Sequence, residues 1–167
     1  MFKLEIKKTF VDDAEFKFPH GLPIGSADIA ACAGCTMIGN NDQETILAFF
    51  LDVRHIVVGF SEVAKGSIDG CPLDFRVALR AALMSPGICG MILVHNHPSD
   101  CTEPSGMDDD VTKRLYCACT VVGLQLIDHV IVGPTGHTYS YQSSGKMRQI
   151  ALSSCDMLSD LMGGRGS

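Results

Sequence analysis

The sequence predicts an α/β fold in which helices pack on the faces of a mixed sheet. Apolar runs with the composition of buried strands, such as residues 45–51 and 90–94, alternate with segments of helical periodicity. Clusters of Gly, Pro, Asn and Asp separate many of these segments and mark turns. A chain of 167 residues with 46% hydrophobic residues allows a sizeable core, so we expect a single domain over residues 1–167.

The first half of the chain is expected to open with a strand, because Phe2, Leu4 and Ile6 alternate with polar residues. Residues 11–24 contain Pro and Gly and are expected to form a loop, after which Ser26 is placed to cap a helix. That helix is expected over Ala27–Thr36. A hairpin of two strands, Thr45–Leu51 and Arg54–Phe60, follows it, and a second helix is expected over Pro72–Met84.

The second half predicts three more strands and two more helices. The strands are expected over Gly90–Val94, Leu124–Val132 and His137–Tyr141, and the helices over 105–121 and Met147–Met162. Residues 98–104 then form a loop, and residues 146–167 contain the C-terminal helix and a flexible tail over Gly163–Ser167. The alternation of strands and helices is typical of an α/β sandwich.

Composition narrows the classes of function. No run approaches the roughly 18–20 apolar residues of a membrane span, and the N-terminus does not resemble a signal peptide, so we expect a cytoplasmic protein. The net charge of −6 and the scattered basic residues argue against a surface that binds nucleic acid unaided. The eight cysteines are expected to be reduced thiols. Cys32 and Cys35 have the spacing of half a zinc knuckle or of a redox pair, but no matching second pair follows, which favours free cysteines.

One stretch carries most of the information about function: His95-Asn96-His97, followed after seven residues by Ser105-Gly106-Met107-Asp108. Side chains at positions i and i+2 of an extended segment point to the same side, so both imidazoles can converge on one ion. Asp108 supplies a third ligand if the loop folds back. Two nitrogens and one carboxylate oxygen, with a fourth position left to water, are typical of a catalytic zinc site. We therefore expect one Zn²⁺ per chain, held by His95, His97 and Asp108.

A structural interpretation of the same stretch needs no metal. Ser105-x-x-Asp108 stands before a helical pattern and resembles a capping box, and a histidine in apolar surroundings is commonly a hydrogen-bonded core residue. The two interpretations are compatible, because a capped helix start would hold Asp108 in place. Pro98 and Pro104, which stiffen the loop, and the fixed spacing of the whole string favour the metal site.

The string resembles the JAMM motif of JAB/MPN-domain metalloproteases, in which a His-x-His, a Ser-x-x-Asp and an upstream Glu build the site. More narrowly, the segments 95–99, 104–108 and 126–133 resemble the RadC branch of that superfamily, within a region from about 22 to 142. The resemblance implies a cytidine-deaminase-like sandwich with a curved mixed sheet. It also implies a zinc metallopeptidase or isopeptidase that uses a metal-activated water on a peptide or protein-conjugate substrate.

The resemblance assigns further roles. The position of Glu44, just before the strand that begins at Thr45, matches the catalytic Glu of the family, whereas Glu62 is more simply a solvated surface charge. Ser105 would hydrogen-bond the oxyanion of the tetrahedral intermediate, besides its role as helix N-cap. His129 lies within an apolar strand, and a satisfied core histidine is favoured over a role at the site. The far ring nitrogens of the histidine ligands need hydrogen-bond acceptors that the sequence does not identify.

The sequence departs from the RadC pattern at three points. Asp100 replaces a common Gly, although Asp tolerates a left-handed backbone better than most residues. Pro72-Leu73-Asp74 stands where Pro-Arg-Glu is common, and the helix-hairpin-helix region of full-length RadC proteins is not found. Two other functions stay open: a DNA-repair-associated protein without peptidase activity, which the acidic charge and the missing helix-hairpin-helix region weaken, and a non-catalytic scaffold, which the intact motif residues argue against. Direct nucleic-acid binding and a membrane partner are not expected, and the oligomeric state is open.

Overall fold

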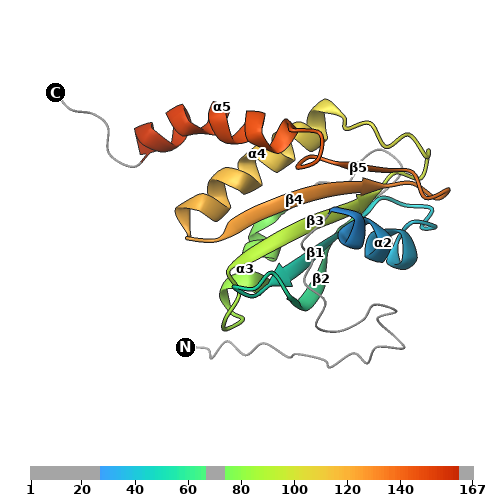
Figure 1. The fold of residues 1–167 in the computed structure, drawn as a ribbon, viewed down its shortest axis with the longest axis horizontal. Coiled ribbons are helices and arrows are strands. Elements are labelled where there is room, and N and C mark those ends of the chain that lie inside the picture. The colour runs from blue at the N-terminus through green and yellow to red at the C-terminus, as the bar shows by residue number, and fades with distance from the viewer. Residues whose placement is uncertain (1–26, 67–73, 162–167) are drawn as a thin grey trace.

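A five-stranded mixed sheet lies between helices on its two faces in the computed structural model, which describes residues 27–66 and 74–161 (Figure 1). The elements follow one another as α2 (Ala27–Met37), β1 (Thr45–Leu51), β2 (Val57–Lys65), α3 (Phe75–Leu83), β3 (Gly90–Asn96), α4 (Gly106–Val121), β4 (Gln125–Val132), β5 (Thr138–Ser140) and α5 (Lys146–Leu161). In this described part of the chain, no helix has both the length and the apolar character that crossing a bilayer requires.

The strands are arranged in the order β2-β1-β3-β4-β5. β3 and β4 run parallel and are joined through α4, whereas the other neighbouring pairs are antiparallel. A parallel pair needs a crossover of this kind, because a tight turn can join only antiparallel strands. The mixed sheet with helices on its faces confirms the predicted fold class.

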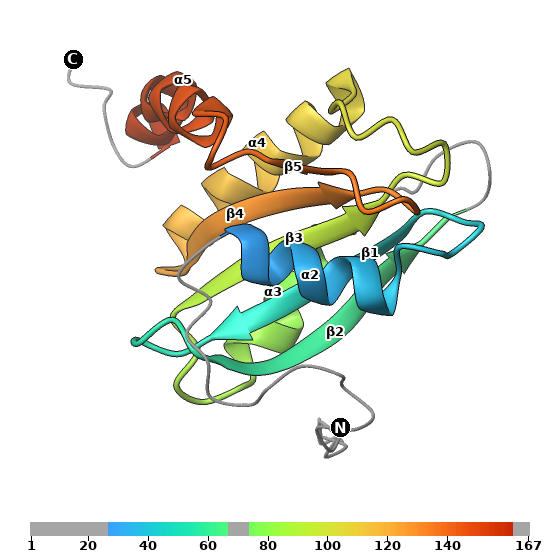
Figure 2. The same cartoon turned by 45° about the vertical axis from the view of Figure 1, so that its right-hand side comes forward.

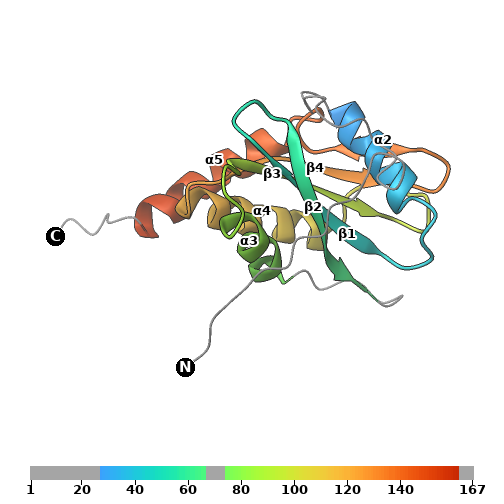
Figure 3. The same ribbon diagram turned by 90° about the horizontal axis from the view of Figure 1, so that it is seen from below.

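Two apolar clusters, one on each face, hold the layers together. On one face, α2 packs on β1, β3 and β4 through residues such as Ala30, Phe49 and Val94. On the other face, α3, α4 and α5 cover a second cluster that includes Ala48 and Leu115. Figure 2 shows α2 in front of the sheet and α3 and α4 behind it, and Figure 3 shows the same layers from below.

Burial on both faces explains why β1 and β3 are continuous apolar runs. All seven residues of β1 and all seven of β3 are buried, and successive side chains of a strand point to opposite faces. The predicted limits of β1 therefore agree with the structure, and β3 extends two residues beyond its predicted end at Val94, as far as Asn96.

The predicted hairpin needs a correction at its second strand. β2 begins at Val57 instead of Arg54 and continues to Lys65, past the expected end at Phe60. The cause is the carboxylate of Asp52, which accepts hydrogen bonds from the amides of Arg54 (2.8 Å) and Ile56 (2.9 Å), while His55 adopts a left-handed φ of 60°. These bonds form a longer loop, and Glu62, which follows the predicted strand, consequently lies inside β2.

The helix limits agree more closely with expectation. Asp74 caps α3 by accepting a hydrogen bond from the amide of Arg76, so this helix starts at Phe75. The predicted strand over residues 2–6, the cap at Ser26, the start of a helix at Pro72 and the tail after residue 161 lie outside the described residues.

Candidate metal centre

The end of β3 places two histidines on one side of the sheet. His95 of β3 pairs with Ile46 of the neighbouring strand β1. Ile46 packs in the cluster beneath α3, α4 and α5, so the imidazole of His95 lies on that face. His97 follows two residues later, and its Nε2 atom lies 2.9 Å from Nε2 of His95. His95 is only 2% exposed, so water reaches this ring poorly.

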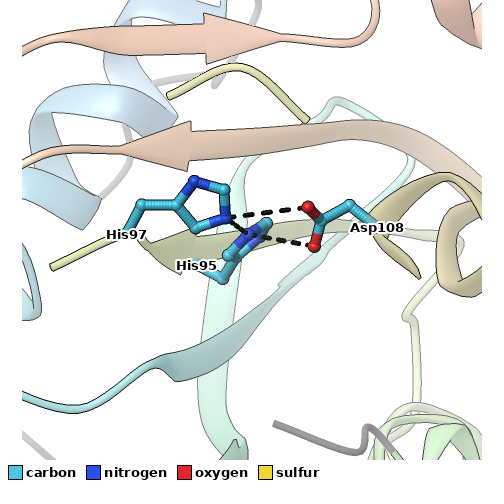
Figure 4. Close-up of side chains that lie close together, drawn as sticks. All are labelled: His95, His97 and Asp108. Atoms are coloured by element: carbon cyan, nitrogen blue, oxygen red, sulfur yellow. Dashed lines mark hydrogen bonds and ion pairs between the residues drawn. The ribbon is translucent and has the colours of Figure 1, made fainter. Parts of the chain in front are cut away.

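Asp108 comes to the same point from the first turn of α4. Ser105 is the N-cap of this helix, and the two residues form a reciprocal capping box, because the Asp108 amide donates to the Ser105 hydroxyl (3.2 Å) while the Asp108 carboxylate accepts from Ser105. Oδ1 of Asp108 lies 3.3 Å from Nε2 of His95, and Oδ2 lies 3.6 Å from Nε2 of His97. Figure 4 shows both rings directing these nitrogens toward the carboxylate.

These three side chains fit a small divalent cation. Ligand bonds of about 2.0–2.2 Å in a tetrahedron place neighbouring ligand atoms about 3.3–3.6 Å apart. The two nitrogen–oxygen separations of 3.3 and 3.6 Å match this range, and the nitrogen–nitrogen separation of 2.9 Å is a few tenths of an ångström shorter. Within the described ranges, this is the one group of three or more His, Cys, Asp or Glu side chains with such convergence.

The protonation states near neutral pH also suit a metal, with one exception. Burial lowers the pKa of His95 well below its ordinary value, so this ring is neutral. Burial alone would raise the pKa of Asp108, but hydrogen bonds from His97 and Ser105 and the neighbouring His95 lower it well below its usual range. The hydrogen bond with Asp108 raises the pKa of His97, so a proton competes with the metal at this one ligand.

The two candidate histidine ligands have hydrogen-bond partners on their far sides. Nδ1 of His95 lies 2.7 Å from Nε2 of His129, and Nδ1 of His97 lies 2.6 Å from the backbone carbonyl of Cys101. His129 in turn lies 2.6 Å from the hydroxyl of Thr112, through its Nδ1 atom. Both rings thus have the outer partners that orient metal-binding histidines.

The sequence alone does not identify His129 or Thr112 as part of this site. His129 is buried and hydrogen-bonded, as the core interpretation expects, yet one of its partners is a candidate ligand. Burial lowers the pKa of His129 to about 4, so its ring stays neutral at physiological pH. The one local sign of a special role for His129 is that a histidine stands in an apolar strand. His129 reaches His95 only through the parallel pairing of β4 with β3, which places His129 beside Leu93.

The structure distinguishes Glu44 from Glu62. The antiparallel register that pairs Ile46 with His95 brings Glu44, two residues earlier, to the same end of the sheet as His97. The charge of Glu44 also contributes to the raised pKa of His97, after the larger effect of the hydrogen bond with Asp108. Glu62 pairs with Leu47, whose side chain packs on the face that α2 covers. Since directly paired residues share a face, Glu62 is exposed on the side away from the histidines.

Asn96, between the two histidines, holds the segment that carries Glu44. Its side-chain oxygen accepts a hydrogen bond from the amide of Thr45 (2.8 Å). Its side-chain nitrogen donates to the carbonyls of Asn41 (3.1 Å) and Gln43 (3.3 Å). One side chain of the His-x-His string therefore fixes the loop before β1 relative to the end of β3.

Asp100 stands where the RadC pattern commonly has Gly, and it adopts a left-handed backbone with a φ of 63°. Its carboxylate accepts hydrogen bonds from the amide (3.2 Å) and hydroxyl (2.6 Å) of Thr135 and lies 3.0 Å from Nδ1 of His137. These partners lower the pKa of Asp100, and they tie the loop over residues 98–104 to the β4–β5 turn.

Cys32 and Cys35 lie on α2, which covers the face of the sheet away from the histidines. Neither belongs to the converging ligand group, and the cysteines in the described residues are free thiols.

Comparison with known proteins identifies one family. The family model described as RadC-like JAB domain matches residues 25–146. A UPF0758 protein of Nitrosococcus oceani is 41% identical over 102 residues, which cover 61% of this chain and 45% of that protein. A UPF0758 protein of Thioalkalivibrio sulfidiphilus is 42% identical over 90 residues, which cover 54% of this chain and 40% of that protein. The match thus spans less than half the length of these relatives.

Proposed function

The chain belongs to the RadC-like JAB domain family, and we propose that it is a zinc-dependent hydrolase of amide bonds in peptides or protein conjugates. The observation that carries this proposal is the convergence of His95, His97 and Asp108 at the end of β3, with outer hydrogen-bond partners on both rings. Structural histidines rarely need such an arrangement, whereas catalytic zinc sites with three protein ligands commonly use it.

His95, His97 and Asp108 are the residues that would hold the ion. A bound zinc ion would supply a Lewis acid and would lower the pKa of a water molecule toward about 7. The chain contributes the rest of the chemistry through groups that bind the substrate and move protons.

Glu44 is the proposed proton carrier. Its carboxylate would accept a proton from the attacking water and deliver it to the nitrogen of the departing amine, so that the same group acts first as base and then as acid. The hydrogen bonds of Asn96 to residues 41, 43 and 45 hold this segment against β3, which limits the movement of Glu44 relative to the histidines.

Ser105 is the proposed donor to the developing oxyanion. Its hydroxyl donates to Oδ2 of Asp108 at 2.6 Å in the substrate-free chain and would turn to the substrate oxygen during the reaction. Its backbone amide also donates to Oδ2, at 2.7 Å, so Asp108 keeps one hydrogen bond from Ser105 during this change.

Charge around the centre favours a peptide substrate over a nucleic acid. Besides Asp108, the exposed or partly exposed acidic residues on the surrounding segments include Glu44, Glu103, Asp109 and Asp110. Phosphates would be repelled by these carboxylates, and the net charge of −6 adds to this effect. We therefore propose a peptide or protein-conjugate substrate and no direct binding to nucleic acid.

The test is hydrolysis of a panel of peptides and lysine-linked isopeptides by zinc-loaded protein. We expect Glu44→Gln to lower the rate by about 10²–10⁴-fold, since an amide of the same size cannot accept the proton. Glu62→Gln is the matched control on the other face of the sheet and should keep the wild-type rate. An active Glu44→Gln variant would exclude Glu44 as the proton carrier. An inert zinc-loaded wild type that binds duplex DNA, with affinity falling steeply as salt rises, would favour the DNA-associated alternative.

A further inference from the structure

We propose that Thr112 and His129 are positioning residues that fix the protonated nitrogen of His95 and join the two elements that carry the metal ligands. This inference builds on the proposed metal site and adds two residues to it. It stands on a chain of hydrogen bonds, here called the circuit, that leads from His95 through His129 and Thr112 to the backbone carbonyl of Asp108.

The hydrogen bonds of the circuit can donate in two directions, and only one of them leaves His95 able to bind a metal. A neutral imidazole carries one N–H, and Nε2 of His95 must keep its lone pair to bind a cation. The proton of His95 then sits on Nδ1 and is donated to Nε2 of His129, 2.7 Å away. His129 therefore carries its own proton on Nδ1 and donates it to the hydroxyl of Thr112 at 2.6 Å.

The carbonyl of Asp108 sets this direction. A carbonyl oxygen can only accept, so the Thr112 hydroxyl must donate its single proton to Asp108 and keep its lone pairs for His129. In the opposite direction, Thr112 would donate to His129, His129 would donate to His95, and the proton of His95 would occupy Nε2. The ring would then present an N–H to the ion, which excludes binding through that atom.

Burial prevents water from replacing any member of the circuit. His95, Thr112 and His129 are 2%, 0% and 1% exposed. Tyr141 also stacks on His129, with ring centroids 5.0 Å apart and an angle of 12° between the planes, and its hydroxyl donates to Asp109 at 2.8 Å. The plane of the His129 ring is therefore fixed on a second side, and a buried polar group that loses its partner has no substitute.

The circuit also joins β3 to α4. His95 comes from β3, His129 from β4, and Thr112 and Asp108 from α4, so its hydrogen bonds cross the interface between sheet and helix. Because Thr112 bonds the carbonyl of the residue that supplies the carboxylate ligand, the same contacts that set the tautomer also hold Asp108 near His95. A metal site with such outer support binds its ion more tightly than one without it.

The chain offers a matched pair of threonines for the test. Thr112 and Thr120 both lie on α4, and each hydroxyl donates to the backbone carbonyl four residues earlier. Thr120 is exposed and bonds Tyr116 at 2.9 Å, and it does not belong to the circuit. Zn²⁺ alone is the probe, with its affinity measured against a chromophoric chelator and the melting temperature of each metal-free variant recorded alongside.

We expect Thr112→Val to weaken zinc binding by about 10–100-fold, Thr112→Ser to restore it, and Thr120→Val to leave it unchanged. Equal affinity in wild type and Thr112→Val would refute this inference and leave the proposed function standing. A wild type that binds no zinc would overturn the proposed function itself. Nitrogen-15 chemical shifts of the metal-free wild type give a test that needs no variant, because the inference requires the proton of His129 on Nδ1, and a proton on Nε2 would overturn it.

Discussion

Ser105 donates two hydrogen bonds to a single oxygen of Asp108, Oδ2, from its amide at 2.7 Å and from its hydroxyl at 2.6 Å. The other oxygen, Oδ1, faces Nε2 of His95 at 3.3 Å. The carboxylate that completes the capping box of α4 is therefore also the third candidate ligand. The structural and the metal-binding interpretations of the Ser-x-x-Asp spacing are therefore compatible, because they use the same carboxylate.

Replacement of Ser105 should separate its two roles. Ser105→Ala removes the N-cap hydroxyl and should cost about 1 kcal/mol of the free energy of unfolding, measured by urea denaturation. If the hydroxyl also holds the oxyanion, kcat/KM should fall by about 10²–10³-fold, more than the loss of folded protein can explain. Ser105→Thr keeps a hydroxyl and serves as control. A drop in stability with an unchanged rate would limit Ser105 to capping.

Local pattern was sufficient for those parts of the site that lie close together in the sequence. The histidine pair at the end of β3 follows from the strand period, and the Asp108 position follows from the capping box at the start of α4. The apolar runs of β1 and β3 were equally clear, because both strands are buried on both faces. In each case, the deciding interactions lie within a few residues.

The parts that could not be predicted depend on long-range register or on side-chain bonds to the backbone. His129 reaches His95 only because β4 pairs in parallel with β3, and Thr112 reaches His129 only because α4 crosses that pair. The start of β2 depends on the bonds of Asp52 to two amides of the hairpin loop, which hydrophobic alternation does not reveal. Glu44 was favoured over Glu62 by resemblance, and only the strand register shows which face each occupies.

Asp108→Asn should abolish metal binding while leaving the helix start largely intact. The amide oxygen can still accept from Ser105, but it offers a cation no negative charge. We expect elemental analysis to find about one equivalent of zinc in the wild type, and near none in Asp108→Asn or in a His95→Ala, His97→Ala double variant. Asp110→Asn, an exposed neighbour on the same helix, is the control and should retain its zinc. Undiminished zinc in Asp108→Asn would place the ion elsewhere.

Asp100 should tolerate glycine better than alanine. Its φ of 63° strains any residue with a Cβ, and Gly alone adopts this backbone freely. Both variants lose the bonds to Thr135 and the contact with His137, so the difference between them isolates the backbone. We expect urea denaturation to rank the wild type first, Asp100→Gly second and Asp100→Ala last. Equal stability of the two variants would mean that the loop adopts another backbone when Asp100 is replaced.

Zinc affinity should rise with pH because of one ligand, His97. Its pKa is raised, first by the hydrogen bond with Asp108, whereas burial keeps His95 neutral. Zinc must therefore displace about one proton, from His97, at any pH below that raised pKa. Titration calorimetry in buffers of different ionisation enthalpy should detect this release near pH 6, where a water with a pKa of about 7 stays largely protonated. No proton release at that pH would contradict the raised pKa of His97.

The stability of the metal-free protein should follow the opposite trend. A group whose pKa is higher in the folded than in the unfolded state stabilises the fold fully below its unfolded pKa, about 6.5 for His, and the contribution is lost as pH rises through the folded pKa. With chelator present, the protonated His97 and Asp108 attract each other in acid, and this attraction should disappear as pH increases above about 6.5. His97→Gln, measured with the same chelator, should remove this loss of stability. A loss of stability over the same pH range that persists in His97→Gln would assign the effect to another group.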